Sequence, residues 1–266
     1  MTVQATVHPT LERPVSHWTG WAQWLALATM TLDHLVRYVF PATWELGWAG
    51  SSLGRIAFPL FAAMVAWHGL FNTRNPLRYA RRILVIGLAA QLPYMLMPRA
   101  SDAFLLNVCF TLALGLAGGA WWRTSLARYR SGSLGSLQLG ATAVGTLMLW
   151  YLLGPWVEYG HLGLLLIPTL MLGMHHLHGS GESLPERLRA AAFALPVLIV
   201  AGMMNSSDMA KSFTVATCFV VLWLAAGAHR LTPLVPTAMP RQLWLAWYPG
   251  HFALIALWLW LSGELV

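Results

Sequence analysis

Three ionisable side chains, Asp33, His34 and Arg37, fall within one apolar stretch, residues 18–40. Such groups are costly in a membrane and are retained when they are paired, face a cavity or do chemistry. The i,i+4 spacing of Asp33 and Arg37 predicts an ion pair on one helix face, with His34 beside it. An imidazole near a carboxylate and a guanidinium suits acyl transfer, in which it removes a proton from an attacking amine or hydroxyl. The same set also suits the proton relay of a transporter, and residue types alone do not decide between them.

Other apolar stretches place polar side chains at a similar predicted depth, counted at about 1.5 Å of helix per residue. One buried polar residue is more often structural than functional, but this many at one level predict a shared site. The residues are Arg55, Gln91, Tyr94, Asn107, Glu158, His161 and His251.

A basic segment at the start of the third apolar stretch provides a second candidate site. Asn75 and Pro76 have the residue types of an N-cap and first helical position, so free backbone amides should face the cytoplasm here. Arginine is unfavourable in a first helical turn, yet four arginines surround this helix start: Arg74, Arg78, Arg81 and Arg82. A bound anion such as a phosphorylated cofactor would suit both amides and arginines. The alternative is that these arginines only hold the loop inside.

Composition shows what must position these groups. Of 266 residues, 58% are hydrophobic and 9% charged, which a soluble fold of this size could not bury. Each apolar stretch should be a helix, because lipid offers backbone groups no partner, and no alternating pattern supports a barrel. We expect an all-α polytopic bundle of about nine transmembrane helices, from stretches at about 18–40, 51–71, 81–98, 103–122, 136–154, 158–174, 189–205, 211–228 and 243–262.

The distribution of basic residues predicts the orientation of this bundle. With the N-terminus in the cytoplasm and the C-terminus in the periplasm, only Arg99 and Lys211 lie in outer loops, and Arg37 and Arg55 lie within or near the outer membrane half. The other Lys and Arg residues then lie inside, namely Arg13, Arg74, Arg78, Arg81, Arg82, Arg123, Arg128, Arg130, Arg187, Arg189, Arg230 and Arg241. We expect one domain, residues 18–262, between a cytoplasmic tail, 1–17, and a C-terminal tail, 263–266.

Several other classes lack support in the sequence. The net charge of +7 follows from basic inner loops, so we expect no nucleic-acid partner. The N-terminal 17 residues have no apolar signal-peptide core, and the first crossing should act as the insertion signal. His175, His176 and His178 lie in a predicted loop where nothing completes a tetrahedral set, so we expect no metal. Gly115 and Gly119 permit close helix packing, and small-residue faces of this kind would also permit a homo-oligomer.

Seven segments of the sequence together resemble the TraX family. They run in order along the chain: TMTLDHLVRYVF (29–40), GRIAFPLFAAMVAWHG (54–69), TRNPLRYARR, QLPY (91–94), LNVCFTLALGL (106–116), EYGHLGLLLI (158–167) and YPGH (248–251). The family is associated with acetylation of the N-terminus of conjugative pilin. The resemblance therefore implies a multi-pass inner-membrane acetyltransferase that uses acetyl-CoA, similar in plan to other transmembrane acyltransferases.

The resemblance also implies roles for the residues found above. Asp33, His34, Arg55 and His251 would form the catalytic set, with His34 as general base or transient acetyl carrier and Asp33 as its orienter. Acetyl-CoA would bind through His68 and the four arginines around the third helix start, with its arm reaching towards His34. The acceptor, pilin or a related extracytoplasmic amine or hydroxyl, would contact Arg37, Gln91, Tyr94, Asn107, Glu158 and His161. A proton-coupled transporter and a noncatalytic pilus-assembly partner remain the alternatives.

Overall fold

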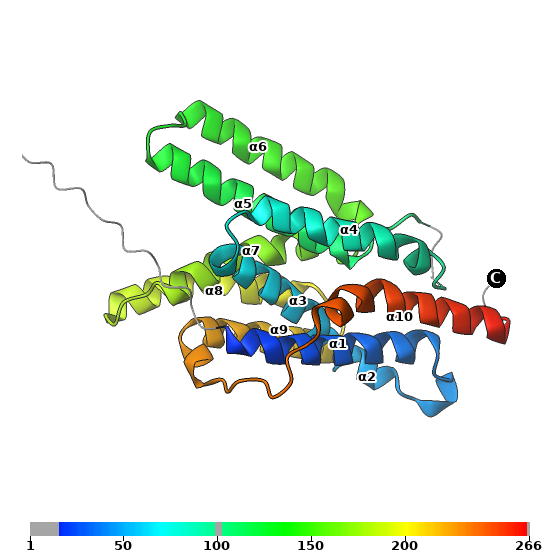
Figure 1. Cartoon of the computed structure of the whole chain (residues 1–266). Coiled ribbons are helices and arrows are strands. Elements are labelled where there is room, and N and C mark those ends of the chain that lie inside the picture. The colour runs from blue at the N-terminus through cyan, green and yellow to red at the C-terminus, as the bar shows by residue number, and fades with distance from the viewer. Residues whose placement is uncertain (1–15, 99–102, 265–266) are drawn as a thin grey trace, which may run out of the picture.

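The computed structural model describes residues 16–98 and 103–264, and within them the regular secondary structure is helical (Figure 1). The long helices follow one another along the chain as α1 (His17–Tyr38), α3 (Gly54–Trp67), α4 (Pro76–Met95), α5 (Val108–Arg130), α6 (Ser136–Leu153), α7 (Gly160–His178), α8 (Leu184–Met203), α9 (Asp208–Ala225) and α10 (Arg241–Ser262). A short helix, α2 (Gly47–Ser51), precedes α3, and a π-helical turn, His68–Asn72, extends α3.

Each apolar stretch predicted from the sequence corresponds to one long helix of the described chain, so the all-α prediction is confirmed. Five helical segments are long and apolar enough to cross a membrane by length and composition: Gly47–Asn72, Ser136–Trp156, Gly160–His178, Asp208–Ala225 and Arg241–Ser262. The number of crossings, the orientation and the homo-oligomer stay predictions. The predicted tails lie largely outside the described residues.

Helix α3 forms the centre of the bundle, where it packs against α1, α5, α7 and α9. Its residues Ala62–Trp67 are all buried, and Ala62, Ala63 and Ala66 leave room for neighbouring helices to approach closely. This part of α3 is therefore solidly packed.

Glycines on α5 bring α7 close, as the sequence predicted. A Cβ at Gly115 would lie 3.2 Å from the Leu164 carbonyl oxygen, and one at Gly119 would lie 3.3 Å from the Pro168 Cα. Helix α6, in contrast, has no buried residue and lies at the edge of the bundle beside α5 (Figure 1).

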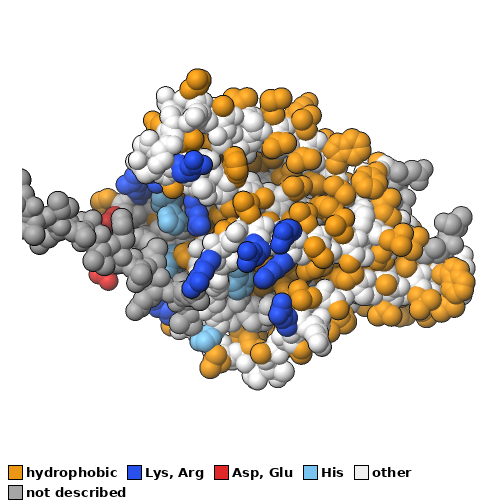
Figure 2. All heavy atoms as spheres, turned by 45° about the horizontal axis from the view of Figure 1, so that its top comes forward, with side chains coloured by type: hydrophobic (Ala, Val, Ile, Leu, Met, Phe, Trp, Pro, Cys, Tyr) orange, Lys and Arg blue, Asp and Glu red, His pale blue; other side chains and the backbone are white. Residues whose placement is uncertain are grey.

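The molecular surface is divided between charge and hydrophobic area. On the face shown in Figure 2, Lys and Arg side chains gather over one part, and hydrophobic side chains cover most of the remainder.

The loop predicted at His175, His176 and His178 is wrong. These residues lie in the last turn of α7, since the helix continues to His178.

Candidate active site

The centre of the candidate site is a histidine pair between α1 and α10. His34 Nδ1 lies 2.7 Å from His251 Nε2, and the two rings are stacked at an angle of 4°. His251 Nδ1 lies 2.8 Å from the backbone carbonyl oxygen of Trp247, one turn earlier on α10. The Trp247 indole nitrogen donates to Thr31 Oγ1 at 2.9 Å, which ties α10 to α1 beside the pair.

These hydrogen bonds determine which ring nitrogens carry protons when both histidines are neutral. The Trp247 carbonyl can only accept, so His251 Nδ1 is the protonated nitrogen and His251 Nε2 is an acceptor. His34 Nδ1 must then donate to His251 Nε2. The lone pair of the His34 ring consequently remains on Nε2, where it is available to accept a proton or attack an electrophile.

Asp33 is held between two arginines. Its Oδ2 lies 3.8 Å from Arg37 Nη2, so the predicted i,i+4 ion pair is present, and its Oδ1 lies 3.5 Å from Arg55 Nη2. Arg55 Nε also donates to the carbonyl oxygen of Gly50 at 3.1 Å. The sequence predicted that Asp33 orients His34, but the hydrogen bond that holds the His34 ring is the one that His34 Nδ1 donates to His251 Nε2. Asp33 instead neutralises the cationic groups beside the histidine pair.

Glycine makes room for the Asp33 carboxylate. A Cβ at Gly54, the first residue of α3, would lie 2.5 Å from Asp33 Oδ1, and one at Gly50 would lie 3.2 Å from it. A Cβ atom 2.5 Å from an oxygen does not occur in real structures, so a side chain at position 54 would force a shift. Glycine at this position therefore allows α1 and α3 to meet at Asp33.

Asp33 and His34 line a narrow cavity of about 30 Å³. A cavity of this volume holds about two water molecules, so it suits a group of only a few heavy atoms. Three further polar residues line it: Glu158 and Tyr159, from the segment before α7, and Tyr248 of α10. Apolar side chains complete the lining, namely Met30, Ala57, Phe58, Phe61 and Val108.

The segment that carries Glu158 and Tyr159 is fixed by the loop before α5. Leu106 N–H donates to the Trp156 carbonyl at 2.8 Å, and Glu158 N–H donates to the Leu106 carbonyl at 2.9 Å. Tyr159 has a φ of 65°, a conformation uncommon for a non-glycine residue, and its ring stacks on Phe58 at 3.9 Å. Backbone strain of this kind persists where surrounding contacts enforce it, and here those contacts close one wall of the cavity.

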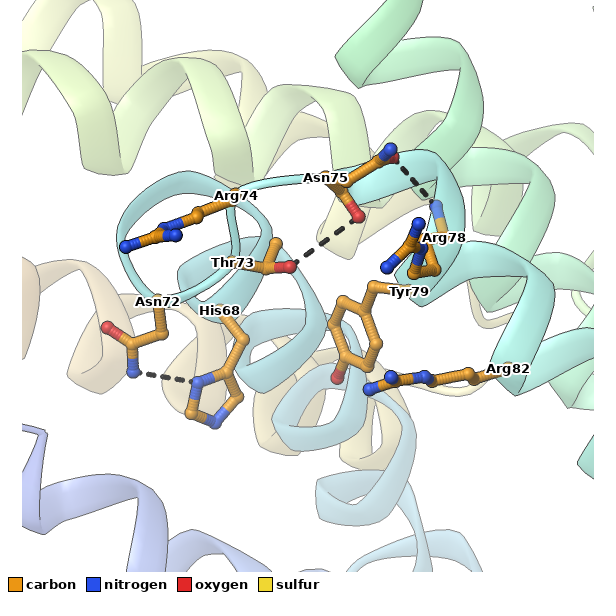
Figure 3. A pocket seen from close by; sticks show the side chains of 8 residues that line it. All are labelled: His68, Asn72, Thr73, Arg74, Asn75, Arg78, Tyr79 and Arg82. Atoms are coloured by element: carbon orange, nitrogen blue, oxygen red, sulfur yellow. Dashed lines mark hydrogen bonds between the residues drawn. The ribbon is translucent and has the colours of Figure 1, made fainter.

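A second, larger cavity of about 420 Å³ lies at the other end of α3 (Figure 3). We call it the basic vestibule, and its lining residues are His68, Asn72, Thr73, Arg74, Asn75, Arg78, Tyr79 and Arg82. Asn75 caps α4 by accepting a hydrogen bond from the Arg78 N–H at 2.9 Å, with Pro76 following it, as predicted. Asn72 Nδ2 lies 2.9 Å from His68 Nδ1. The vestibule thus combines a helix N-terminus with three guanidinium groups.

The structure brings together only some of the predicted site residues. Arg81 is exposed and does not line the vestibule, although Arg78 and Arg82 on the same helix do. Among the predicted acceptor contacts, Glu158 lines the His34 cavity and Arg37 reaches it through Asp33.

Asn107 and Gln91 instead bond to each other and to nearby backbone. Gln91 Oε1 accepts from Asn107 Nδ2 at 2.8 Å, Gln91 Nε2 donates to the Leu105 carbonyl at 2.8 Å, and Asn107 Nδ2 donates to the Gly87 carbonyl at 2.8 Å. These bonds fasten the loop before α5 to α4. The polar groups of both residues therefore have structural partners outside the His34 cavity.

His161 and Tyr94 also lie outside the lining of the His34 cavity. The His161 ring packs against Trp150 of α6, and its Nε2 lies 3.0 Å from the Tyr151 carbonyl oxygen. The Tyr94 ring packs edge-on against Phe252 at 5.5 Å. Depth along a helix therefore did not predict the direction in which these side chains point.

Sequence reasoning gave no role to Tyr159 or Tyr248, although both line the cavity. A usable signal was present for Tyr248, which precedes His251 by three residues and so shares its helix face. Tyr159 follows Glu158 directly, but its inward position depends on a left-handed backbone conformation.

The vestibule and the His34 cavity share no lining residue. Phe61 lines the cavity and His68 lines the vestibule, a separation of about 10 Å along the helix at 1.5 Å per residue. The buried residues Ala62–Trp67 of α3 lie between them along that helix. The arrangement is thus a helical membrane-protein bundle with a small polar cavity and a separate basic opening.

The chain belongs to the TraX family, because residues 21–259 match the family described as TraX protein. Neither the curated proteins nor the solved structures provide a match. Family membership places the protein in the context of conjugation and pili, in a family linked in general to pilin acetylation.

Proposed function

We propose that this protein is an acetyltransferase of the bacterial inner membrane that moves acetyl from cytoplasmic acetyl-CoA to an extracytoplasmic acceptor, the N-terminal amine of pilin. The observation that carries the proposal is the chain of hydrogen bonds from Trp247 through His251 to His34, which leaves a lone pair on His34 Nε2. A histidine held in one tautomer beside a small cavity suits proton removal or acetyl transfer at neutral pH.

The two cavities suit the two ends of acetyl-CoA. The vestibule offers Arg74, Arg78 and Arg82 with the α4 amides to the phosphates and is large enough for a nucleotide portion. The cavity of about 30 Å³ at His34 suits the acetyl group. Because Ala62–Trp67 are buried between them, the proposal requires the helices around this part of α3 to separate while the pantetheine arm passes.

In the direct mechanism, the nitrogen of the acceptor amine attacks the thioester carbon while His34 Nε2 takes a proton from that amine. The carbonyl π pair moves to oxygen, then returns as the carbon–sulfur bond breaks, and CoA leaves as a thiolate that receives the proton from His34. In the covalent mechanism, His34 Nε2 attacks the thioester carbon and the carbon–sulfur bond breaks, so that CoA leaves as a thiolate. The amine then attacks the acetyl carbon, the bond to His34 Nε2 breaks, and the proton lost by the amine passes to the CoA thiolate.

Purified protein incubated with labelled acetyl-CoA and a peptide with the pilin N-terminus tests the proposal. We expect label transfer that His34→Ala reduces by about 10²- to 10⁴-fold. His175→Ala, at the far end of α7 and outside both cavities, should retain wild-type transfer. Label trapped on the protein without acceptor would identify the covalent route.

Folded protein that neither binds nor turns over acetyl-CoA would overturn the assignment. Substrate flux that depends on His34 but not on acetyl-CoA would indicate a transporter. A His34→Ala variant that still supports pilus assembly and pilin acetylation would indicate a noncatalytic partner.

A further inference from the structure

The hydroxyl group of Tyr248 is buried without a hydrogen-bond partner among the described residues. Tyr248 is 8% exposed, and its Oη makes no hydrogen bond of normal geometry there. A buried polar atom without a partner is uncommon in folded proteins and calls for an explanation, such as a role towards a ligand. Phenylalanine would fill the same space without this cost, so packing alone does not account for the hydroxyl.

The residue that carries this hydroxyl belongs to the wall of the His34 cavity. Tyr248 lines the cavity together with His34 and Val108, and its ring centroid lies 5.7 Å from that of His251. Because Tyr248 and His251 are three residues apart on α10, the phenol and the His251 imidazole lie on one face of that helix. The phenol is thus placed by the same element that places the candidate base.

Val108 lines the same cavity as Tyr248. Val108 is the first residue of α5, and the side chain of the N-cap residue Asn107 accepts from the next amide, that of Cys109. A first-turn amide has no partner within its own helix. Tyr248 and Val108 thus each bring one hydrogen-bond donor, a phenolic O–H and a first-turn N–H, to the residues that line this cavity.

We propose that the Tyr248 hydroxyl and the Val108 amide bind the acetyl carbonyl oxygen and stabilise the oxyanion formed during transfer. The inference rests on the proposed function and adds the group that receives the developing negative charge. When nitrogen attacks the thioester carbon, the carbonyl π pair moves onto oxygen, and the two donors hydrogen-bond to it. The pair then returns to re-form the carbonyl as the carbon–sulfur electrons leave with CoA, so no further reactant is needed.

The charges around the cavity fit this assignment. Asp33 is matched by Arg37 and Arg55, so the carboxylate beside His34 is compensated. Glu158, the other acid of the lining, is an acceptor and suits the N–H groups of the attacking amine instead.

The test is Tyr248→Phe, assayed for acetyl transfer beside wild type and His34→Ala. We expect kcat to fall by about 10²- to 10³-fold, the usual loss when one oxyanion donor is removed. The KM for acetyl-CoA should stay unchanged, because the donor acts on charge that exists only in the transition state. The temperature of unfolding should equal or exceed that of wild type, because the change removes a buried donor without a partner.

Tyr129→Phe is the matched control, since Tyr129 is exposed in the last turn of α5, and it should transfer acetyl at the wild-type rate. A second variant, with 3-fluorotyrosine at position 248, keeps the volume and the donor and should retain activity. If Tyr248→Phe unfolds at a lower temperature and the fluorinated variant is also slow, the role is structural and the inference is wrong.

Wild-type kcat in Tyr248→Phe, with activity still lost in His34→Ala, would overturn the oxyanion role alone. Absence of transfer in wild type would overturn the proposed function instead. The two failures are therefore distinguished within one assay.

Discussion

The basic vestibule and the His34 cavity differ in volume, in position along α3 and in charge. The basic vestibule has a volume of about 420 Å³, lies at the start of α4 and carries three arginines among its lining residues. The His34 cavity has a volume of about 30 Å³, and the carboxylate of Asp33 in its wall is matched by two arginines. A large site with excess positive charge suits an anion from water, whereas a small site with paired charges suits an uncharged group.

This difference implies that the His34 cavity serves the chemical step and the vestibule serves binding of acetyl-CoA, which experiments can test. Changes in the His34 cavity should alter kcat, because they act on the reacting atoms or their supports. Changes in the vestibule should alter affinity for acetyl-CoA and leave kcat close to its wild-type value. A variant that breaks this pattern would show that the two cavities do not serve one substrate.

Beyond the changes at His34 and Tyr248, the largest effect should come from His251→Leu. Without the acceptor at His251 Nε2, the His34 Nδ1–H loses its partner and the ring can adopt the other tautomer. We expect kcat to fall roughly 10- to 100-fold, as when other groups that fix a histidine tautomer are removed. His251→Gln, whose side-chain oxygen accepts hydrogen bonds, should restore part of this loss. Wild-type kcat in His251→Leu would show that His34 does not depend on the pair.

Gly54→Ala should destabilise the protein by roughly 1–3 kcal/mol, because its methyl group would push against Asp33. Thermal unfolding of the purified protein measures the change. Gly47→Ala is the matched control, since a Cβ at Gly47 has no atom within 4 Å and should leave stability unchanged. Equal unfolding temperatures for both variants would contradict the packing described at Asp33.

In the vestibule, Arg78→Gln and Arg82→Gln should each raise the KM for acetyl-CoA about three- to tenfold. The expected loss is modest because both side chains are exposed to solvent. Arg81→Gln changes the same residue type on the same helix but removes no lining group, so its KM should match wild type. A KM increase for Arg81→Gln as large as the others would favour a general charge effect over a defined site.

The smallest effect should be that of salt. Raising ionic strength from 0.1 to 1 M shortens the Debye length from about 10 to about 3 Å, which screens exposed arginines more than buried pairs. Affinity for CoA, measured by equilibrium binding, should weaken several-fold, while single-turnover transfer from bound acetyl-CoA should keep its rate. If salt also slows transfer from bound acetyl-CoA, the exposed arginines would contribute to the chemical step.

The sequence by itself determined the helical elements and several local contacts. Apolar stretches separated by short polar loops define the long helices, because a backbone in lipid must satisfy its own hydrogen bonds. The Asp33–Arg37 pair and the Asn75 cap were also readable, since each depends only on spacing within one helix or at its start. Gly115 and Gly119 identified a close helix contact, though not that α7 would fill it.

Tertiary structure decided which polar groups share a cavity. Depth along a helix follows from residue count, but the direction of a side chain depends on how each helix is rotated against its neighbours. That rotation turned Gln91 and Asn107 towards each other, His161 towards α6, and Tyr248 into the wall beside His34. The partner of His34 likewise came from α10, 217 residues away, because the pairing of distant side chains is a property of helix packing and not of local sequence.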